Sequence, residues 1–201
     1  MENKIVIDNA LDQQSFDALY DHMMGTGFEW YFNPGIVKDN TTDFQFVHGI
    51  DSGYYMTSPH NYSFIFPIND ILMPQSIIRI KANLTGRTDK VVVHGFHNDV
   101  HATGSLTAVY YVNSNDGHTE FEDGDKVPSV ANRLVIFPSR LKHSGTSCTN
   151  QQRRVVINFN YIPWRDNKHW QQLMSPEDIK YRQHWEQGMN LPTDSKGVPI
   201  K

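Results

Sequence analysis

The chain has 201 residues, close to the length of one domain, and 38% of them are hydrophobic and 12% aromatic, which excludes a disordered chain. A net charge of −4 provides no global basic field and argues against non-specific binding of nucleic acid. Cys148 is the one cysteine, so an internal disulfide is excluded and a reducing compartment is favoured. The sequence shows no signal peptide and no apolar run of transmembrane length, so we expect a cytoplasmic protein that does not enter a membrane.

The N-terminal third is expected to form a strand and a helix before a long irregular stretch. Residues 4–7 are rich in β-branched side chains, and they precede a helix with Asp12 as its N-cap and apolar residues at helical spacing up to Gly25. Residues 28–32 are typical of a second strand. Residues 36–61 are polar and aromatic without a clear period, so we expect long loops and edge strands there, of the kind that often carry substrate contacts.

An alternating strand is the clearest secondary-structure signal in the middle of the chain. It spans residues 76–84 and follows a short helix, predicted at residues 68–73, which a proline ends. One face of the strand is apolar, and the other carries Arg79, Lys81 and Asn83. Charged residues on the second face of a strand usually meet solvent, but here they could also line a cavity.

Short strands separated by turn residues dominate the rest of the chain up to Pro163. The predicted strands span residues 106–112, 119–122, 134–137 and 154–162. This pattern predicts an all-β sandwich or barrel with flanking helices, organised as a single domain over residues 1–201. From about residue 163 the composition becomes polar, and we expect a C-terminal helical appendage up to residue 201, with a helix that begins at Ser175 and ends at Gly188.

The triplet His97-Asn98-Asp99 is the strongest candidate for chemistry. Side chains two positions apart on an extended segment point to the same side, so His97 and Asp99 could bind one metal ion. His143 could supply the third ligand, and two imidazoles with one carboxylate on one side of a metal leave positions open for oxygen chemistry at iron. On this spacing alone, a polar loop beside a strand end explains the pair equally well.

Two other histidines in the same segment bear on these roles. His101 shares the parity of His97 and Asp99 and could replace one of them as a ligand. His94 has the opposite parity, so we expect it at the surface. Further along the chain, Arg154 opens an apolar strand, where a buried guanidinium could hold a carboxylate.

Five motifs occur in one order along the chain. They are His97-Asn98-Asp99, the strand at residues 106–113, Asp116-Gly117-His118-Thr119-Glu120-Phe121, His143-Ser144-Gly145, and Arg154 with the strand that follows it. In this order the motifs resemble the Fe(II)- and 2-oxoglutarate-dependent dioxygenases of the prolyl 4-hydroxylase-like group, above all its small bacterial and phage-encoded members. The resemblance covers residues 76–161 well and implies a mainly β fold, the double-stranded β-helix or cupin-like jelly roll, with flanking helices.

The resemblance also implies a role for each candidate residue. His97, Asp99 and His143 match the iron ligands, and Arg154 matches the residue that holds the distal carboxylate of 2-oxoglutarate. Tyr111 matches a tyrosine that, in relatives, donates a hydrogen bond to the same carboxylate. The catalytic set is therefore expected to comprise the three ligands and the arginine.

Arg153 also lies near the spacing expected for the arginine that holds the carboxylate. We prefer Arg154, because it directly precedes the apolar run and shares parity with Asn158, whereas Arg153 is expected to remain in the loop. Asn158 is expected on the same face as Arg154, where it could help to hold the co-substrate.

The activity that the resemblance implies is hydroxylation of a C–H bond, with Fe(II) as metal, 2-oxoglutarate and dioxygen as co-substrates, and ascorbate as a supporting reductant. A prolyl residue in a peptide or protein is the first substrate that it suggests, although residues 82–88 carry Asn83 and lack the tyrosine usual in prolyl hydroxylases ahead of the first histidine. A nucleobase or a small molecule stays open as substrate. A local basic strip, formed by Arg79, Lys81, Arg87 and Lys90, could lead nucleic acid to the iron.

Two further functions fit the same fold. A cupin-like metalloenzyme that does not use 2-oxoglutarate would need no buried arginine, so the position of Arg154 discriminates against it. A non-catalytic jelly-roll binding module would have no affinity for iron, and its histidines would simply lie at a surface. The fold alone does not separate these functions, because one fold supports many activities.

Overall fold

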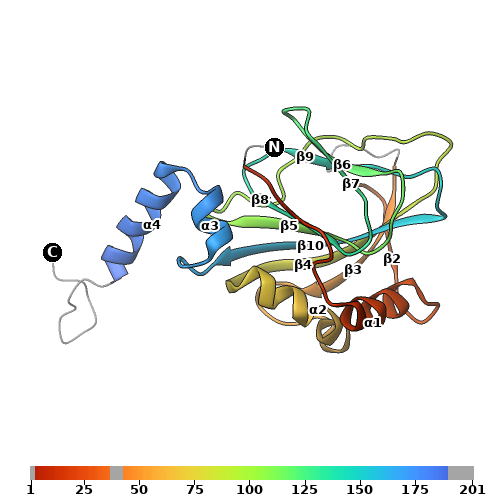
Figure 1. The fold of residues 1–201 in the computed structure, drawn as a ribbon, viewed down its shortest axis with the longest axis horizontal. Helices are drawn as coiled ribbons and strands as arrows, with labels where there is room; N and C mark the ends of the chain where they lie inside the picture. Colours follow the sequence, from red (N-terminus) through yellow and green to blue (C-terminus); the bar gives the residue numbers. More distant parts are fainter. Residues whose placement is uncertain (1–2, 37–42, 190–201) are drawn as a thin grey trace.

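Two antiparallel sheets form the centre of the molecule, a computed structural model that describes residues 3–36 and 43–189 (Figure 1). The strands are β1 (Ile5–Ile7), β2 (Tyr31–Asn33), β3 (Gln45–Asp51), β4 (Pro74–Gly86), β5 (Leu106–Tyr111), β6 (His118–Phe121), β7 (Lys126–Pro128), β8 (Arg133–Pro138), β9 (His143–Gly145) and β10 (Arg153–Pro163). The large sheet has the order β1-β8-β5-β10-β4-β3-β2, and the small sheet has the order β7-β6-β9. This arrangement confirms the predicted mainly β jelly roll with flanking helices.

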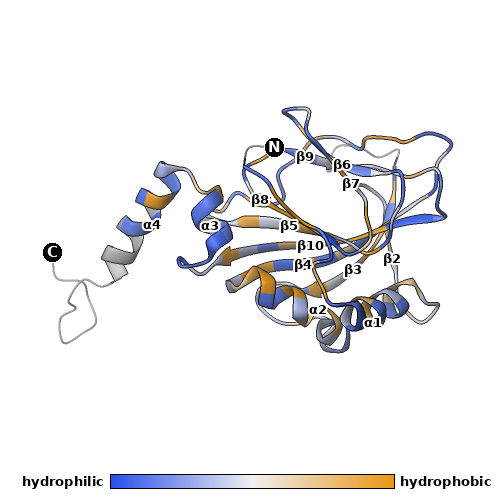
Figure 2. Cartoon of the chain, in the orientation of Figure 1, coloured by the Kyte–Doolittle hydropathy of each residue, from blue (hydrophilic) through white to orange (hydrophobic). Residues whose placement is uncertain are grey.

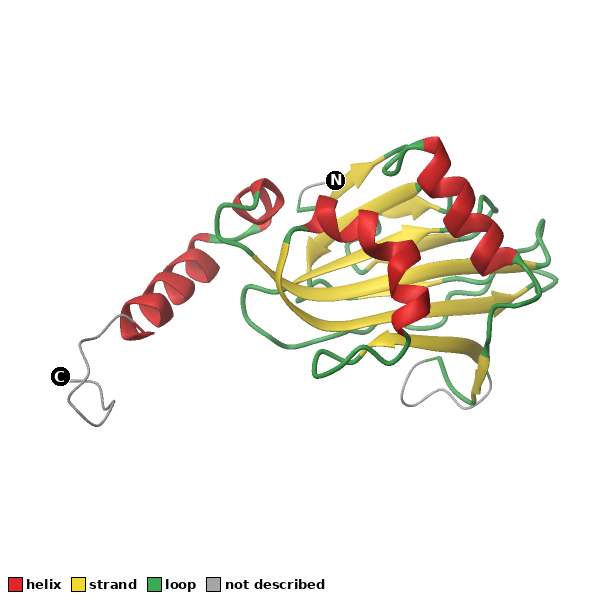
Figure 3. Cartoon of the chain, turned by 90° about the horizontal axis from the view of Figure 1, so that it is seen from below, coloured by secondary structure: helices red, strands yellow, loops and turns green. Residues whose placement is uncertain are grey.

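The helices of the described part are α1 (Gln13–Met24), α2 (Pro59–Leu72), α3 (Lys168–Leu173) and α4 (Pro176–Met189). Figure 3 shows α1 and α2 lying across one face of the large sheet, and in Figure 1 the small sheet lies on its other side. The α4 helix points away from the sheets in both views. None of the described helices is long and apolar enough to cross a membrane.

Strand β10 lies between β5 and β4 in the large sheet, and its residues alternate between two environments. Val155, Ile157 and Phe159 are fully buried in the main hydrophobic core, together with residues of α1 and α2. In Figure 2 hydrophobic residues are concentrated along α2 and the strands of the large sheet. The alternation predicted for residues 76–84 and 154–162 is therefore confirmed as strands β4 and β10.

Residues 36–61 contain more regular structure than their sequence indicates. The prediction of loops and edge strands was wrong for β3, which lies inside the large sheet between β2 and β4. Gln45 and His48 in this strand are both buried and polar, so the apolar alternation that marks a strand is hidden. The strand predicted at residues 28–32 is shifted toward the C-terminus, because β2 begins at Tyr31.

Helix α2 is longer than the predicted helix at residues 68–73. It begins at Pro59, where proline suits the first turn of a helix, and it contains Pro67 in its interior. Ile65, Ile68 and Leu72 are buried against the sheet. Tertiary packing of this apolar face therefore outweighs the weak helix propensity of the proline-containing part.

The C-terminal part packs against the sheets through α3, a helix that the sequence did not indicate. Trp170 of α3 is buried, and its ring N–H donates to the carbonyl oxygen of Gly104 at 3.2 Å. Helix α4 begins as predicted, because Asp178 N–H donates to Ser175 Oγ at 3.2 Å and the Ser175 hydroxyl donates to the Asp178 carboxylate at 2.6 Å. The helix continues past Gly188, and residues 190–201 of the predicted appendage lie outside the described residues.

Candidate active site

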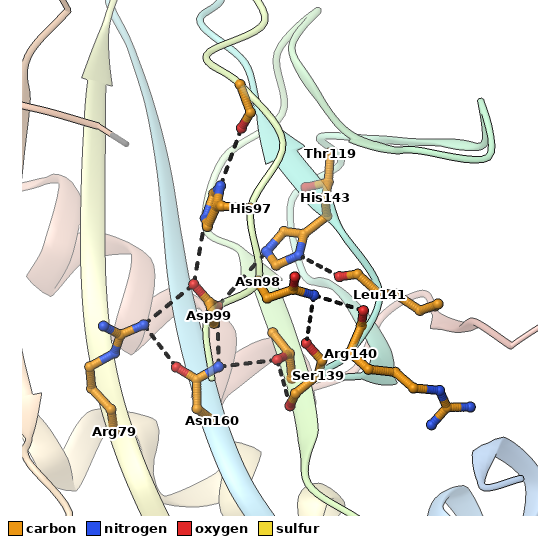
Figure 4. A network of polar contacts seen from close by, with 12 residues as sticks. Arg79, His97, Asn98, Asp99, Thr119, Ser139, Arg140, Leu141, His143 and Asn160 are labelled. Carbon is orange, nitrogen blue, oxygen red and sulfur yellow. Dashed lines mark hydrogen bonds and ion pairs between the residues drawn. The ribbon is translucent and has the colours of Figure 1, made fainter. Parts of the chain in front are cut away.

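His97, Asp99 and His143 come together between the two sheets. One nitrogen or oxygen atom of each side chain lies within 4.8 Å of those of the other two. The backbone positions the two histidines, because the N–H of each donates to the carbonyl oxygen of the other at 3.0 Å, in an isolated antiparallel bridge. Figure 4 shows both imidazoles pointing toward the carboxylate of Asp99. The three residues predicted as metal ligands are thus assembled on one site.

The backbone also orients the two imidazole rings. The Nδ1 atom of His97 lies 3.2 Å from the Gly95 carbonyl oxygen, and that of His143 lies 3.2 Å from the Leu141 carbonyl oxygen. A carbonyl oxygen can only accept, so each Nδ1 carries the proton and each Nε2 keeps its lone pair. These Nε2 atoms lie 3.6 Å and 3.8 Å from the oxygens of Asp99. Both rings therefore present the nitrogen that a metal ion would bind.

The carboxylate of Asp99 is buried and held from two strands of the large sheet. Arg79 Nη2 on β4 lies 3.4 Å from Oδ1, and Asn160 Nδ2 on β10 donates to Oδ2 at 3.1 Å. Arg79 also donates to Asn160 Oδ1 at 3.0 Å, which closes a triangle of polar contacts visible in Figure 4. Asn160 is fully buried and bonds Thr107 Oγ1 at 3.1 Å as well. The orientation of the carboxylate is therefore fixed before any metal binds.

The charge state of the triad follows from these contacts. Burial would raise the pKa of Asp99, but the neighbouring imidazole of His97 and the charges of His143 and Arg79 together lower it below its ordinary value. The nearby carboxylate of Asp99 raises the pKa of His97, whereas burial lowers the pKa of His143. Asp99 is therefore an anion, as a metal ligand has to be.

The other histidines of the segment take different positions from those considered for them. His101 is exposed and does not belong to the group that could hold a metal. The prediction that His94 lies at the surface was wrong, because this residue is 7% exposed and lines the same cavity as the triad. The cause is Gly95, whose φ of +112° interrupts the extended backbone and with it the alternation of side chains.

The triad forms part of the wall of a cavity between the sheets. The large sheet contributes Gln45, Lys81, Asn83, Thr85, Val109, Arg154, Val156 and Asn158, and Thr119 and Gly145 come from the small sheet. Arg154 is 4% exposed, and its Nε donates to Ser129 Oγ at 2.9 Å while its Nη2 lies 3.4 Å from Thr119 Oγ1. Among the residues that the structure describes, no carboxylate pairs with Arg154.

A buried guanidinium that has only hydroxyl partners is suited to an anion that enters the cavity. Gly117 makes room for the arginine side chain, because a Cβ atom there would lie 2.9 Å from Arg154 Cδ and 2.6 Å from the Ser147 carbonyl oxygen. Because the triad and Arg154 line one cavity, this donor set fits a dicarboxylate that binds the metal at one end and the guanidinium at the other.

Two other residues considered for binding the co-substrate, Arg153 and Tyr111, do not line the cavity. Arg153 faces away from the cavity, and its guanidinium donates to the Met24 carbonyl oxygen at the end of α1. Tyr111 is fully buried beneath Arg154, with its ring centroid 5.6 Å from the guanidinium carbon, and its hydroxyl donates to Thr119 Oγ1 at 2.7 Å. Thr119 therefore lies between Tyr111 and the cavity, and direct contact of Tyr111 with a carboxylate stays a prediction.

Sequence reasoning missed the residues that support the site. Arg79 was expected to meet solvent or line a cavity, and Asn160 was not singled out. One signal was present, because Asn160 shares parity with Arg154 and Asn158 on the last strand. Its partnership with Arg79 is fixed by the pairing of Asn160 with Arg79 between β10 and β4, and this register cannot be obtained from either strand alone.

Comparisons with known proteins agree with this geometry. Residues 87–162, which contain the triad and Arg154, match the family model described as the 2OG-Fe(II) oxygenase superfamily. No curated protein matches the chain in sequence. Among solved structures, a prolyl-4-hydroxylase from Pseudomonas putida is 17% identical, with a TM-score of 0.54 and a match that covers 81% of this chain and 94% of that one.

Two other solved structures show the same fold. A prolyl hydroxylase from Trichoplax adhaerens, in complex with a hypoxia inducible factor peptide fragment, is 13% identical, with a TM-score of 0.56 and coverage of 81% of this chain and 84% of that one. HygX from Streptomyces hygroscopicus, with nickel, 2-oxoglutarate and hygromycin B bound, is 10% identical, with a TM-score of 0.51 and coverage of 82% and 84%.

The family match and the intact ligand set point to the same metal and co-substrate. Two histidines and one carboxylate on one side of a metal are the ligands of non-haem Fe(II) oxygenases, and the family implies 2-oxoglutarate and dioxygen as co-substrates. Residues 87–162 are therefore similar to the 2OG-Fe(II) oxygenase superfamily, and the triad of His97, Asp99 and His143 that these enzymes require is intact.

Proposed function

We propose that the chain hydroxylates a C–H bond, with a prolyl residue in a peptide or protein as the first substrate to test. In this proposal the triad holds Fe(II), and Arg154 holds the distal carboxylate of 2-oxoglutarate. The observation that carries the proposal is the buried guanidinium of Arg154, which shares a cavity with the triad and has no acidic partner among the described residues.

When bound, the metal and the co-substrate supply the oxidising chemistry, with succinate and carbon dioxide as by-products. The chain itself supplies geometry and a partly apolar wall. Arg79 and Asn160 keep Asp99 in place, and Ser129 and Thr119 orient the guanidinium of Arg154. Val109 and Val156 line the cavity with apolar surface, which limits the access of water to the reacting groups.

The prolyl substrate rests on the resemblance of the motifs and on two prolyl hydroxylases among the similar structures, whose identities of 17% and 13% establish the fold alone. HygX has the same fold and was solved with hygromycin B, so the fold accepts other compounds. Residues 82–88 carry no tyrosine, and Asn83 lines the cavity in that region. The substrate panel therefore has to extend beyond prolyl peptides.

The metal and co-substrate part of the proposal is tested without any substrate. Anaerobic titration of the protein with Fe(II) and then with 2-oxoglutarate should produce the visible charge-transfer band of the iron chelate. The band should be absent in Asp99→Ala and unchanged in His101→Ala, whose exposed side chain lies outside the triad. A normal band in Asp99→Ala would contradict the ligand set.

The substrate part is tested by succinate release over prolyl peptides, free amino acids and oligonucleotides. Stimulation by prolyl peptides, together with hydroxyproline in the product, would support the proposal. Stimulation by oligonucleotides alone, lost when the exposed Arg87 and Lys90 are neutralised, would replace it with a nucleic-acid oxygenase. Iron binding without stimulation by any compound would leave the protein without a hydroxylase activity in this panel, and would contradict the proposed substrate class.

A further inference from the structure

Lys81 is a second cation in the cavity, and the co-substrate does not require it. It lies on β4 and lines the cavity with His97 and Asp99. The side chain is half-buried, and burial followed by the charge of Arg79 lowers the pKa of its ammonium. Among the described residues, this ammonium has neither an ion pair nor a hydrogen bond. A partly buried cation without a partner loses solvation, and a ligand of opposite charge would compensate this loss.

The register of the large sheet places Lys81 at the metal end of the cavity. Lys81 pairs with Asn158 of β10, whereas Arg154 pairs with Thr85, four residues further along β4. Four residues of a strand correspond to about 13 Å. The two cations therefore serve different ends of the cavity, with Arg154 at the end away from the triad.

The metal end of the cavity has no unpaired negative charge for Lys81 to neutralise. Arg79 forms an ion pair with Asp99, so the negative charge of this ligand has a partner from the protein. A bound Fe(II) would add two positive charges, which the metal-end carboxylate of 2-oxoglutarate offsets in part. The metal end would therefore be net positive, and Lys81 adds a further positive charge that neither the protein nor the co-substrate offsets.

The surroundings of Lys81 have room and further polar atoms for a ligand. On the β3 side it pairs with Gly49, which is exposed, and a Cβ atom built there would meet only Thr57 Oγ1, at 3.6 Å. The amide oxygens of Asn83 and Asn158 are buried without hydrogen-bond partners in the described part of the molecule. An amino-acid-like compound offers both a carboxylate for the ammonium and N–H donors for such oxygens.

From these observations we propose that Lys81 binds a carboxylate of the primary substrate, so that the substrate is an acid with this group close to the oxidised carbon. A free amino acid or a C-terminal residue has this chemistry, whereas an internal prolyl residue has it only beside an acidic side chain. The inference rests on the proposed function, since it assumes that the triad end of the cavity receives the substrate.

The test uses the whole chain loaded with Mn(II), which takes the place of iron without oxygen chemistry, and saturated with 2-oxoglutarate. Two pairs of probes, each an acid and its neutral amide, are titrated by calorimetry: N-acetyl-L-proline with N-acetyl-L-prolinamide, and propionate with propionamide. We expect each acid to bind about ten- to a hundredfold more tightly than its amide, the range for one hydrogen bond between charged groups. Lys81→Met should abolish this preference, and Lys168→Met, which alters an exposed lysine of α3, should retain it.

Each other outcome has a defined meaning. Acids that bind no better than their amides to the wild-type protein would overturn the inference, as would a preference that survives in Lys81→Met. If Lys81 instead binds the metal-end carboxylate of 2-oxoglutarate, the variant will weaken 2-oxoglutarate binding and the wild-type protein will show no preference for the acids, which also overturns it. A preference for acids without succinate release from any prolyl compound would retain the Lys81 site and reject the prolyl substrate, so the two proposals fail separately.

Discussion

On strand β10, Val155, Ile157 and Phe159 pack in the main core. Arg154 and Asn158 belong to the alternate positions of the strand, and they line the cavity. The first set faces α1 and α2 and is wholly apolar, and the second is mainly polar. One strand thus supplies both the stability of the sheet and the groups of the site. Because side chains alternate with period two, a slip of one residue in register would exchange the two sets. The apolar face therefore fixes the positions of the polar groups that bind ligands.

This comparison predicts that substitutions on the two faces of β10 have different effects. Substitutions on the helix face should lower the free energy of unfolding and leave ligand affinity intact in the folded protein. Substitutions on the cavity face should lower affinity with a small effect on folding.

The largest expected effect is the loss of iron from the triad. Replacing His97, Asp99 or His143 with Ala should abolish Fe(II) binding while the sheet still folds, because each change removes a ligand and little core volume. Metal content after anaerobic loading, with circular dichroism for folding, measures this. If His101→Ala abolished Fe(II) binding and His97→Ala did not, the metal ligand would be His101 and not His97.

The second effect tests the helix face. Phe159→Ala should lower the free energy of unfolding by about 3–5 kcal/mol, because it leaves a cavity in the core. Urea denaturation measures this loss, and Phe159→Leu serves as a milder control. At a temperature where the variant is folded, its iron affinity should equal that of the wild type. Weaker iron binding with unchanged stability would contradict the division between the faces.

The third effect concerns the arginine of the cavity face. Arg154→Ala should leave a buried carboxylate of 2-oxoglutarate without its charged partner, a loss of about 2–5 kcal/mol. The affinity for 2-oxoglutarate should then fall by roughly 30-fold or more, since about 1.4 kcal/mol corresponds to tenfold. Titration of the charge-transfer band measures it. Arg153→Ala, which removes a contact with α1, should change this affinity little, and the reverse pattern would show that Arg153 holds the co-substrate.

The smallest effect concerns the support of Asp99. Arg79→Met keeps much of the side-chain volume but removes the contacts with Asp99 and Asn160, and it should lower iron affinity by about 10- to 100-fold. Competition with a chelator measures the affinity, and Arg87→Met, which alters an exposed residue directly after β4, is the control. Arg79 reaches both partners through one nitrogen, Nη2, so Arg79→Lys, which keeps the charge and several donors on one nitrogen, should restore part of the affinity. Equal iron affinity of Arg79→Met and the wild type would remove Arg79 from the support.

Much of the site could be predicted because its residues belong to short local patterns. His97 and Asp99 are two residues apart, and Arg154 is recognised by the apolar run that follows it. The strands β4 and β10 could be predicted for a similar reason, since their alternation is visible in the sequence.

What could not be predicted depends on contacts between distant segments or on one unusual backbone angle. Arg79 and Asn160 meet only through the register of β4 with β10. His94 turned inward because Gly95 has a positive φ, which no spacing rule detects. Helix α2 includes Pro67, whose cost is offset by packing on the sheet and not by local propensity.

The placement of Arg154 and Asn160 on a single strand has a consequence for the length of the co-substrate. Asn160 holds Asp99 of the triad, and Arg154 would hold the far carboxylate, so both ends of the co-substrate would depend on residues of one strand. The hydrogen bonds of β10 to β4 and β5 keep the spacing of these two residues fixed. A 2-oxo diacid one methylene shorter or longer than 2-oxoglutarate should therefore bind more weakly, because the strand cannot adjust to its length.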